Sequence, residues 1–205
     1  MYQQFLEGPL FYNAWSLIHF MPRCKAIQQI VKQKPSARVL DLGCGTGLFK
    51  KHVPDCEYTG IDNNPAYIDY ARKRLPGLFI LGDIFDLQGH LGGRAFDFAV
   101  INGVLHHLDD ALLLRLLGTL PALLATGGRI IVVDHIWSDA LNPVNTFLVR
   151  HDRGACSRSE AAYRSLFKDF TIESFATFTI NVGPLVLWKQ CRFVLRGSED
   201  AGACP

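Results

Sequence analysis

Five apolar runs, separated by segments of helical character, most strongly constrain what this chain of 205 residues can fold into. The runs are continuous and do not alternate with polar residues, which is typical of strands buried on both faces of a parallel sheet. Helical segments between such strands indicate repeated strand–helix units. The runs predict strands at Arg38–Leu42, Tyr58–Ile61, Leu78–Leu81, Phe96–Ile101 and Arg129–Val133.

The segments around these strands predict helices with identifiable ends. We expect helices at Arg23–Lys34, Leu48–His52, Pro65–Leu75 and Asp110–Leu124, and a loop around Leu87–Arg94. Pro35 ends the first helix. Pro65 suits the first turn of its helix, with Asn63 or Asn64 as the N-cap.

The chain after the fifth strand follows another pattern. A loop leads to a helix that opens at Ser159-Glu160, and two further strands follow at Phe170–Phe178 and Leu185–Leu195. Because the link between these strands is too short for a helical crossover, they must pair antiparallel. We therefore expect an α/β fold with a Rossmann-like, doubly wound sheet of seven strands. The sheet is mostly parallel with the last strand antiparallel, and helices cover both faces.

Composition and charge exclude several classes of protein. The net charge is +2 without a long basic run, so no nucleic-acid partner is expected. The six cysteines match no zinc or disulfide spacing, which favours reduced thiols in the cytoplasm and no metal. The apolar stretch from Val182 to Arg196 is too short and too polar to span a membrane. A mean hydropathy of +0.13 indicates an apolar pocket or the interface of a homodimer.

The turn after the first strand, within VLDLGCGTGLF, contains three glycines and therefore has few side chains. Such a turn lets a ligand touch the backbone directly. The dinucleotide fingerprint would need glycine at position 48, where Leu48 stands. Asp41, two residues before Gly43, is awkward beside a pyrophosphate and well placed for a cation.

Two later acidic residues are placed to contact other parts of the same ligand. Asp62 ends the second strand, where a carboxylate can accept hydrogen bonds from both hydroxyls of a ribose. Asp83 and the apolar Ile84 follow the third strand and suit an adenine ring. An ammonium, a ribose and an adenine together describe S-adenosylmethionine.

Four motifs in order, DLGCGTG, GID, GDI and FDFAVINGVLHHL, resemble those of class I S-adenosylmethionine-dependent methyltransferases. The resemblance covers roughly residues 37–193. It implies that Asp41, Gly43 and Gly45 line the methionine part, that Asp62 holds the ribose, and that Asp83 and Ile84 meet the adenine. It also implies that Asn102 contacts the methionine end. We include Cys44, Asn63 and Gly103 in the predicted cofactor site.

The candidate catalytic residues are His106, His107 and His135, at the ends of the fourth and fifth strands. An imidazole there could accept a proton from a hydroxyl or an amine. The alternative is that these histidines only fix their loops. A metal site built from His106, His107, Asp109 and Asp110 is a further alternative, although adjacent side chains diverge.

The candidate acceptor-binding residues lie in two other segments. Arg150 and Arg153, in a basic stretch that also holds Arg158, could bind a carboxylate or phosphate, or could brace the loop against the sheet. Tyr12 and Trp15 could form a lid or pack a helix.

We therefore expect one methyltransferase domain over residues 1–205 that acts on a small molecule. Residues 1–35 would form a helical cap or lid and 36–136 the cofactor-binding core. Residues 137–196 would form the substrate-side loop, helix and hairpin, and 197–205 a tail. The methylated atom, whether O, N or C, stays open. INGVLHH after the fourth strand, in place of a motif such as NPPY, argues against methylation of the amino groups of nucleic-acid bases. The alternatives are an inactive S-adenosylmethionine-binding module and, disfavoured by Leu48, an NAD-dependent oxidoreductase.

Overall fold

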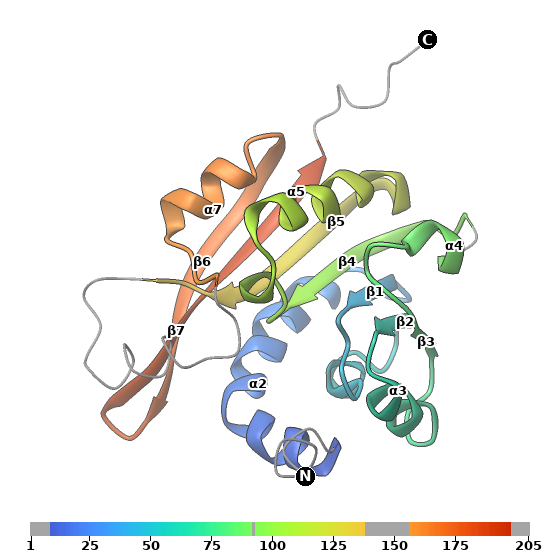
Figure 1. Cartoon of the computed structure of the whole chain (residues 1–205), viewed down its shortest axis with the longest axis horizontal. Helices are drawn as coiled ribbons and strands as arrows, with labels where there is room; N and C mark the ends of the chain where they lie inside the picture. Colours follow the sequence, from blue (N-terminus) through green and yellow to red (C-terminus); the bar gives the residue numbers. More distant parts are fainter. Residues whose placement is uncertain (1–8, 92, 138–155, 198–205) are drawn as a thin grey trace.

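A single seven-stranded sheet organises the part of the chain that the structure describes (Figure 1). The structure is a computed structural model that describes residues 9–91, 93–137 and 156–197, with side chains from residue 20 onward. Its strands are β1 (Arg38–Leu42), β2 (Glu57–Asp62), β3 (Leu78–Leu81), β4 (Phe96–Asn102), β5 (Leu124–His135), β6 (Phe170–Val182) and β7 (Leu185–Gly197).

The strand order is β3-β2-β1-β4-β5-β7-β6. Strands β1 to β5 pair in parallel, and β7 runs antiparallel to both of its neighbours, β5 and β6. Six strands therefore share one direction and the last is reversed, which confirms the predicted topology. The order reverses between β1 and β4, and ligands of doubly wound sheets bind beside that reversal, outside the carboxyl ends of the strands.

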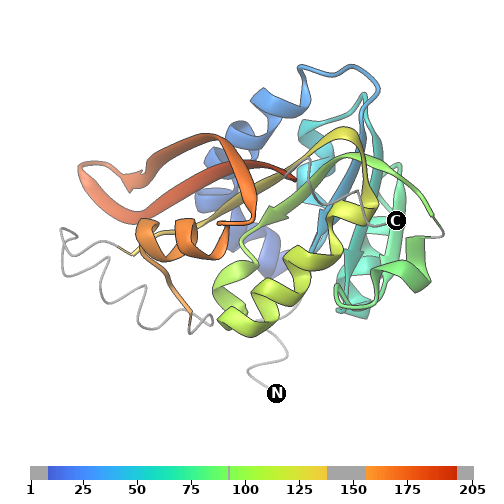
Figure 2. The same ribbon diagram turned by 90° about the horizontal axis from the view of Figure 1, so that it is seen from above.

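Helices cover both faces of the sheet, as predicted (Figure 2). One face carries α2 (Pro9–Val31), the 3-10 turn η1 (Leu48–His52) and α3 (Pro65–Arg72), which pack with Val39 and Val133. The other face carries α4 (Leu87–Leu91), α5 (Asp110–Thr119) and α7 (Glu160–Leu166), which pack with Leu40 and Leu42. Strand β1 is thus buried on both sides, which explains its continuous apolar sequence.

Short polar side chains begin three of these helices. Asn64, one of the two predicted caps, accepts hydrogen bonds from the backbone N–H groups of the first turn of α3. Ser159 caps α7 by accepting from Ala162 N at 3.2 Å. Asp109 caps α5 by accepting from Leu112 N at 2.8 Å. Each cap satisfies a helix N–H group that has no partner within its own helix.

The first helix begins earlier than predicted. α2 starts at Pro9 and passes through Pro22, whereas the sequence predicted a start at Arg23. Proline lacks an N–H group and removes one hydrogen bond of the helix. Burial of Cys24, Ile27 and other apolar residues beyond Pro22 holds this part of the helix on the sheet in spite of that loss.

Other boundaries also differ from the expectation. The predicted loop around Leu87–Arg94 contains the short helix α4, and the predicted helix Asp110–Leu124 ends at Thr119, followed by the 3-10 turn η3 (Pro121–Leu123). Strands β6 and β7 are longer than predicted, and only two residues join them. Because β5 pairs with β7 only up to Gln190, the tip of the hairpin extends beyond the sheet.

Two properties of the described residues bear on the class of protein. No helix among them is both long and apolar enough to cross a membrane. The cysteines among them are free thiols, at Cys24, Cys44, Cys56, Cys156 and Cys191.

Candidate functional site

The Gly-rich turn joins β1 to η1 at the carboxyl edge of the sheet. Gly45 has a φ of +55°, a left-handed conformation that side-chain-bearing residues rarely adopt. A Cβ on Gly43 would lie 2.6 Å from Val104 Cγ2, so the turn lies directly against the segment that follows β4. The predicted bare turn is therefore confirmed, and it brings the ends of β1 and β4 together.

Asp62 links this turn to the end of β2. Its Oδ2 accepts from Gly45 N at 2.8 Å, and its Oδ1 accepts from Asn64 N at 2.9 Å. Burial raises the pKa of Asp62, and hydrogen bonds from backbone N–H groups offset part of that shift. The residue predicted to hold a ribose thus also fixes the Gly-rich turn.

Asp41 lies inside the edge and is almost fully buried. Burial raises its pKa to about 7; the charge of Asp62 adds to the shift, and the hydrogen bond from the Tyr58 hydroxyl opposes it. A cation brought next to this carboxyl would favour its ionised form. The cation-binding role expected of Asp41 stays a prediction.

The residues predicted to meet an adenine lie farther along the same edge. Asp83 and Asn63 are exposed and Ile84 is half-buried. Asp83 Oδ1 accepts from Phe85 N at 2.9 Å, which closes the turn after β3. The hydrogen bond from Gly82 N to Asp62 O, at 3.0 Å, holds this turn beside the end of β2.

Asn102 ends β4 with an unsatisfied side chain. Its Nδ2 and Oδ1 atoms are both buried, and neither has a hydrogen-bond partner within the described part of the chain. A buried polar group without a partner costs roughly 1–3 kcal/mol. This orphaned amide points to a ligand at the end of β4, where the methionine end of the cofactor is expected.

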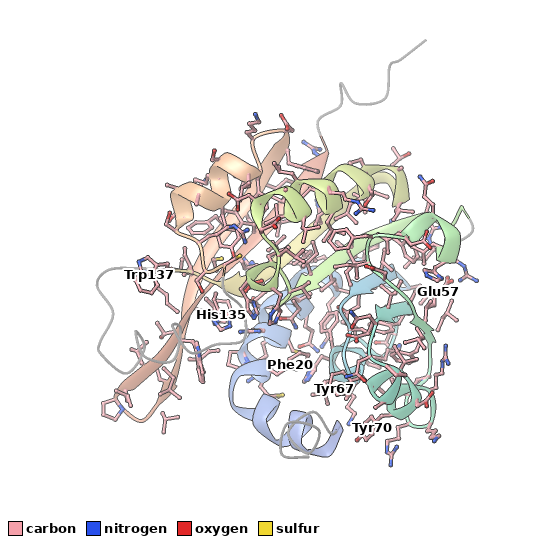
Figure 3. All side chains as sticks on the ribbon, in the orientation of Figure 1. Phe20, Glu57, Tyr67, Tyr70, His135 and Trp137 are labelled. Atoms are coloured by element: carbon pink, nitrogen blue, oxygen red, sulfur yellow. The ribbon has the colours of Figure 1, made fainter. Side chains whose placement is uncertain are left out.

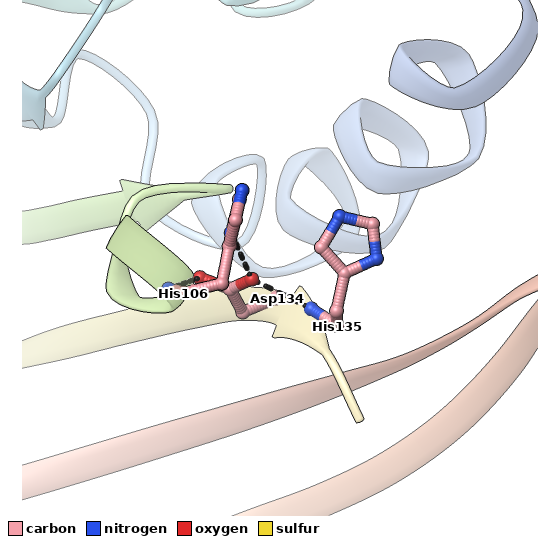
Figure 4. Close-up of side chains that lie close together, drawn as sticks. All are labelled: His106, Asp134 and His135. Atoms are coloured by element: carbon pink, nitrogen blue, oxygen red, sulfur yellow. Dashed lines mark hydrogen bonds and ion pairs between the residues drawn. The ribbon is translucent and has the colours of Figure 1, made fainter. Parts of the chain in front are cut away.

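A second cluster lies beside Asn102, at the end of β5 (Figure 4). Asp134 Oδ1 is 2.7 Å from His106 Nδ1 and accepts from His135 N at 2.6 Å. Its Oδ2 accepts from Leu105 N at 2.7 Å. Burial alone would raise the pKa of Asp134, but the two histidines and Arg23 hold it well below its usual range. Asp134 is therefore an ionised carboxylate that orients His106.

His135, the residue after Asp134, lies between the sheet and α2 (Figures 3 and 4). Its Nε2 is 2.9 Å from Arg23 Nη2, and its Nδ1 is 2.9 Å from Gln190 Nε2. The imidazole thus connects α2, β5 and β7.

Arg158 braces the segment that carries His106, the 3-10 turn η2 (Leu105–His107). Its guanidinium donates to Leu105 O at 2.9 Å and to Leu108 O at 2.6 Å, and it pairs with Asp110 at 2.7 Å. Of the two roles considered for the basic stretch, Arg158 has the bracing one. Because Asp109 caps α5 and Asp110 pairs with Arg158, these acids do not join His106 and His107 in a metal site.

A different set, His106, Asp134 and His135, places one possible ligand atom each within 4.8 Å of the others. The Arg23 guanidinium lies against one of those atoms, His135 Nε2. A permanent positive charge at that position disfavours a metal ion.

His107 is exposed, but its ring lies 4.0 Å from the ring of His106, centroid to centroid, so His107 borders the cluster. Tyr12 and Trp15 belong to α2, but their side chains lie outside the description, as do Arg150 and Arg153. Asp134 could have been suspected from its position at a strand end next to His135. Arg23 and Gln190 carry no local signal in the sequence.

Comparison with known proteins identifies the family. Residues 33–169, well over half of the chain, match a family model described as a methyltransferase domain. A trans-aconitate 2-methyltransferase from Methylobacterium radiotolerans is 35% identical over 132 residues, which cover 61% of this chain and 48% of that protein. A demethylmenaquinone methyltransferase from Thermotoga maritima is 31% identical over 117 residues, covering 55% and 49%.

A solved structure of similar fold is the magnesium protoporphyrin IX methyltransferase of Synechocystis with bound SAH. It has 16% identity and a TM-score of 0.66, with 88% of this chain and 84% of that chain covered. The chain therefore belongs to the methyltransferase domain family, within class I of the S-adenosylmethionine-dependent methyltransferases. It spans about half the length of the two sequence relatives.

Proposed function

We propose that this chain transfers the methyl group of S-adenosylmethionine to a small-molecule oxygen or nitrogen, and that His106 accepts the proton. The supporting observation is the buried pair of His106 and the ionised Asp134, next to the orphaned amide of Asn102. The relatives are named for small acceptors such as trans-aconitate and demethylmenaquinone.

Residues at the carboxyl edge of the sheet would each bind a different part of the cofactor. Asp62 would hold the ribose, Asp41 the cationic methionine end, and Asn102 its remaining polar groups. When bound, S-adenosylmethionine supplies an activated methyl group, so the chain mainly has to align the acceptor and exclude water. Asp134 holds His106 with its proton on Nδ1, which makes Nε2 the nitrogen that can take a proton from the acceptor.

Two neighbouring histidines allow a matched test. After an acceptor has been found by screening for release of S-adenosylhomocysteine, His106→Gln should lower kcat about 10²- to 10⁴-fold, as expected for loss of a general base. The loss should shrink at high pH, where the acceptor ionises without help. His107→Gln, at the exposed neighbouring position, should change kcat less than about threefold.

Both variants should bind S-adenosylhomocysteine normally in calorimetry. A His106→Gln enzyme with full kcat would remove His106 from the mechanism. Failure of the unaltered chain to bind either sulfur nucleoside would reject the proposed function as a whole.

A further inference from the structure

Arg23 brings a permanent positive charge from α2 into the acceptor side of the site. The residue is buried, and its Nη2 lies 2.9 Å from His135 Nε2. Its Nη1 would collide with a Cβ on Gly103, so the guanidinium rests on the bare backbone after β4. His106 Cε1 is 3.9 Å from the position of that Cβ. Arg23 and the ring of His106 therefore both lie close to Gly103, the residue after Asn102.

The contact with Arg23 fixes the protonation state of His135. A guanidinium only donates, so Nε2 must accept and the ring hydrogen must be on Nδ1. Nδ1 then needs an acceptor, and the side-chain amide of Gln190 lies 2.9 Å away. Turning that amide so that its oxygen faces Nδ1 gives the ring N–H an acceptor, and the amide nitrogen then takes the buried position that Oε1 held. His135 is therefore an uncharged imidazole in this arrangement.

A neutral imidazole is a weaker partner for a guanidinium than a carboxylate is. Charge-assisted pairs are about twice as strong as neutral ones, and a carboxylate can accept two parallel hydrogen bonds from arginine. An anion that reached this position would compete well with His135. Because Gly103 has no side chain, the guanidinium can lie directly against the backbone at that point.

We propose that Arg23 and His135 form the binding site for a carboxylate of the acceptor, a refinement that rests on the proposed methyl transfer. The carboxylate replaces the imidazole as the partner of the guanidinium. His135 Nε2, once released, takes up one proton from solvent and donates it in a hydrogen bond to the same anion. The covalent chemistry is unchanged, because only a hydrogen-bond partner is exchanged and one proton is bound.

The groups that face His135 are compatible with this proton uptake. Asp134 is ionised and contacts the backbone of His135, while the His106 ring lies 4.7 Å away, centroid to centroid. From the other face, the Tyr163 hydroxyl of α7 donates to His135 O at 3.2 Å. From β7, Gln190 lies against His135 Nδ1, and the Cys191 thiol donates to Asp134 O. The approaching carboxylate adds negative charge, which favours a protonated imidazole.

Calorimetry on the full chain saturated with S-adenosylhomocysteine tests the site. The probes are trans-aconitate, malonate and benzoate, and the trimethyl ester of trans-aconitate is the uncharged control. We expect at least one carboxylate to bind, the ester to bind at least about tenfold more weakly, and the heat to depend on the buffer as one proton is taken up. Absence of binding by all three carboxylates would overturn the proposal.

Substitutions of Arg23 and His135 test whether these two residues bind the carboxylate. Arg23→Met should weaken carboxylate binding at least about tenfold, and Arg23→Lys should lose less, because lysine keeps the charge but not the planar fork. His135→Gln should still bind the anion but without proton uptake. Affinity for S-adenosylhomocysteine should stay within about threefold in each variant, which shows that the fold is intact.

Equal carboxylate binding by Arg23→Met and the unaltered chain would overturn the proposal and leave methyl transfer standing. If Arg23→Met does not fold, Arg23→Lys replaces it, and unchanged carboxylate binding with unchanged proton uptake in that variant would equally overturn the proposal. Loss of S-adenosylhomocysteine binding in the unaltered chain would instead reject the proposed function.

Discussion

The pKa values of two buried aspartates at the same edge of the sheet are shifted in opposite directions. Asp41, in the half built by β1 to β3, has a pKa raised to about 7, because burial removes water and the hydrogen bond from the Tyr58 hydroxyl offsets only part of that shift. Asp134, in the half built by β4 to β7, is equally buried, but His106, His135 and Arg23 hold its pKa below the usual range. In the half predicted to bind the acceptor, Asp134 has the cation Arg23 among the groups that shift its pKa, whereas in the half predicted to bind the cofactor, Asp41 has no cation among those groups.

We call β1 to β3 the receptor half, because its buried carboxyl would gain a charged partner from a ligand. We call β4 to β7 the preassembled half, because its buried carboxylate already has its partners within the protein. A cationic ligand beside Asp41 relieves the cost of ionising a buried carboxyl. Asp134 needs no such ligand, because three backbone N–H groups and the His106 ring already donate to it. Binding energy is therefore expected from the receptor half, and fixed geometry from the preassembled half.

The largest expected effect tests the preassembled half. Asp134→Ala should lower the free energy of unfolding by roughly 3–5 kcal/mol, since it leaves Arg23 and the orphaned N–H groups without their buried counter-charge. Urea denaturation measures this loss. Asp110→Ala, which removes an exposed partner of Arg158, should cost about 1 kcal/mol or less. Equal losses in the two variants would contradict the central role of Asp134.

A smaller effect is expected from the receptor half. Asp62→Ala should weaken binding of S-adenosylmethionine by about 1.5–3 kcal/mol, because the ribose hydroxyls and Gly45 N lose a charged acceptor. Calorimetry measures the change, and Asp69→Ala on the exposed side of α3 is the control. Unchanged affinity in Asp62→Ala would place the ribose elsewhere.

The smallest expected effect is a dependence of the free energy of unfolding on pH. Because the folded pKa of Asp41 lies above its unfolded value, the stability it contributes is fully present below about pH 4 and is lost as the pH rises to about 7. The slope should not exceed about 1.4 kcal/mol per pH unit in that window and should disappear in Asp41→Asn.

Cofactor binding should show the opposite trend. A cation prefers ionised Asp41, so affinity for S-adenosylmethionine should rise between about pH 5 and pH 7 in the unaltered chain and change less in Asp41→Asn. Parallel titrations at several pH values measure both trends. The same pH profile in both proteins would show that Asp41 does not meet the cation.

Local signals predicted the receptor half well. The ends of β1 and β3, the cap at Asn64 and the bare turn at Gly45 all follow from short stretches of sequence. The contact that holds the turn, from Gly45 N to Asp62, spans only 17 residues along the chain. The start of α2 was predicted wrongly: the sequence predicted a helix from Arg23, whereas packing against the sheet carries the helix through Pro22.

The sequence by itself determined the order of strands and turns, and with it the family and the edge where ligands bind. Burial on two faces and backbone conformation at glycine leave marks within a few residues, so both can be predicted locally. Only the tertiary structure decided which histidine is buried against Asp134 and that Arg23 meets His135, 112 residues away. Such partners are chosen by how α2, β5 and β7 pack together, and packing of distant segments leaves no periodic pattern in the sequence around any one of them.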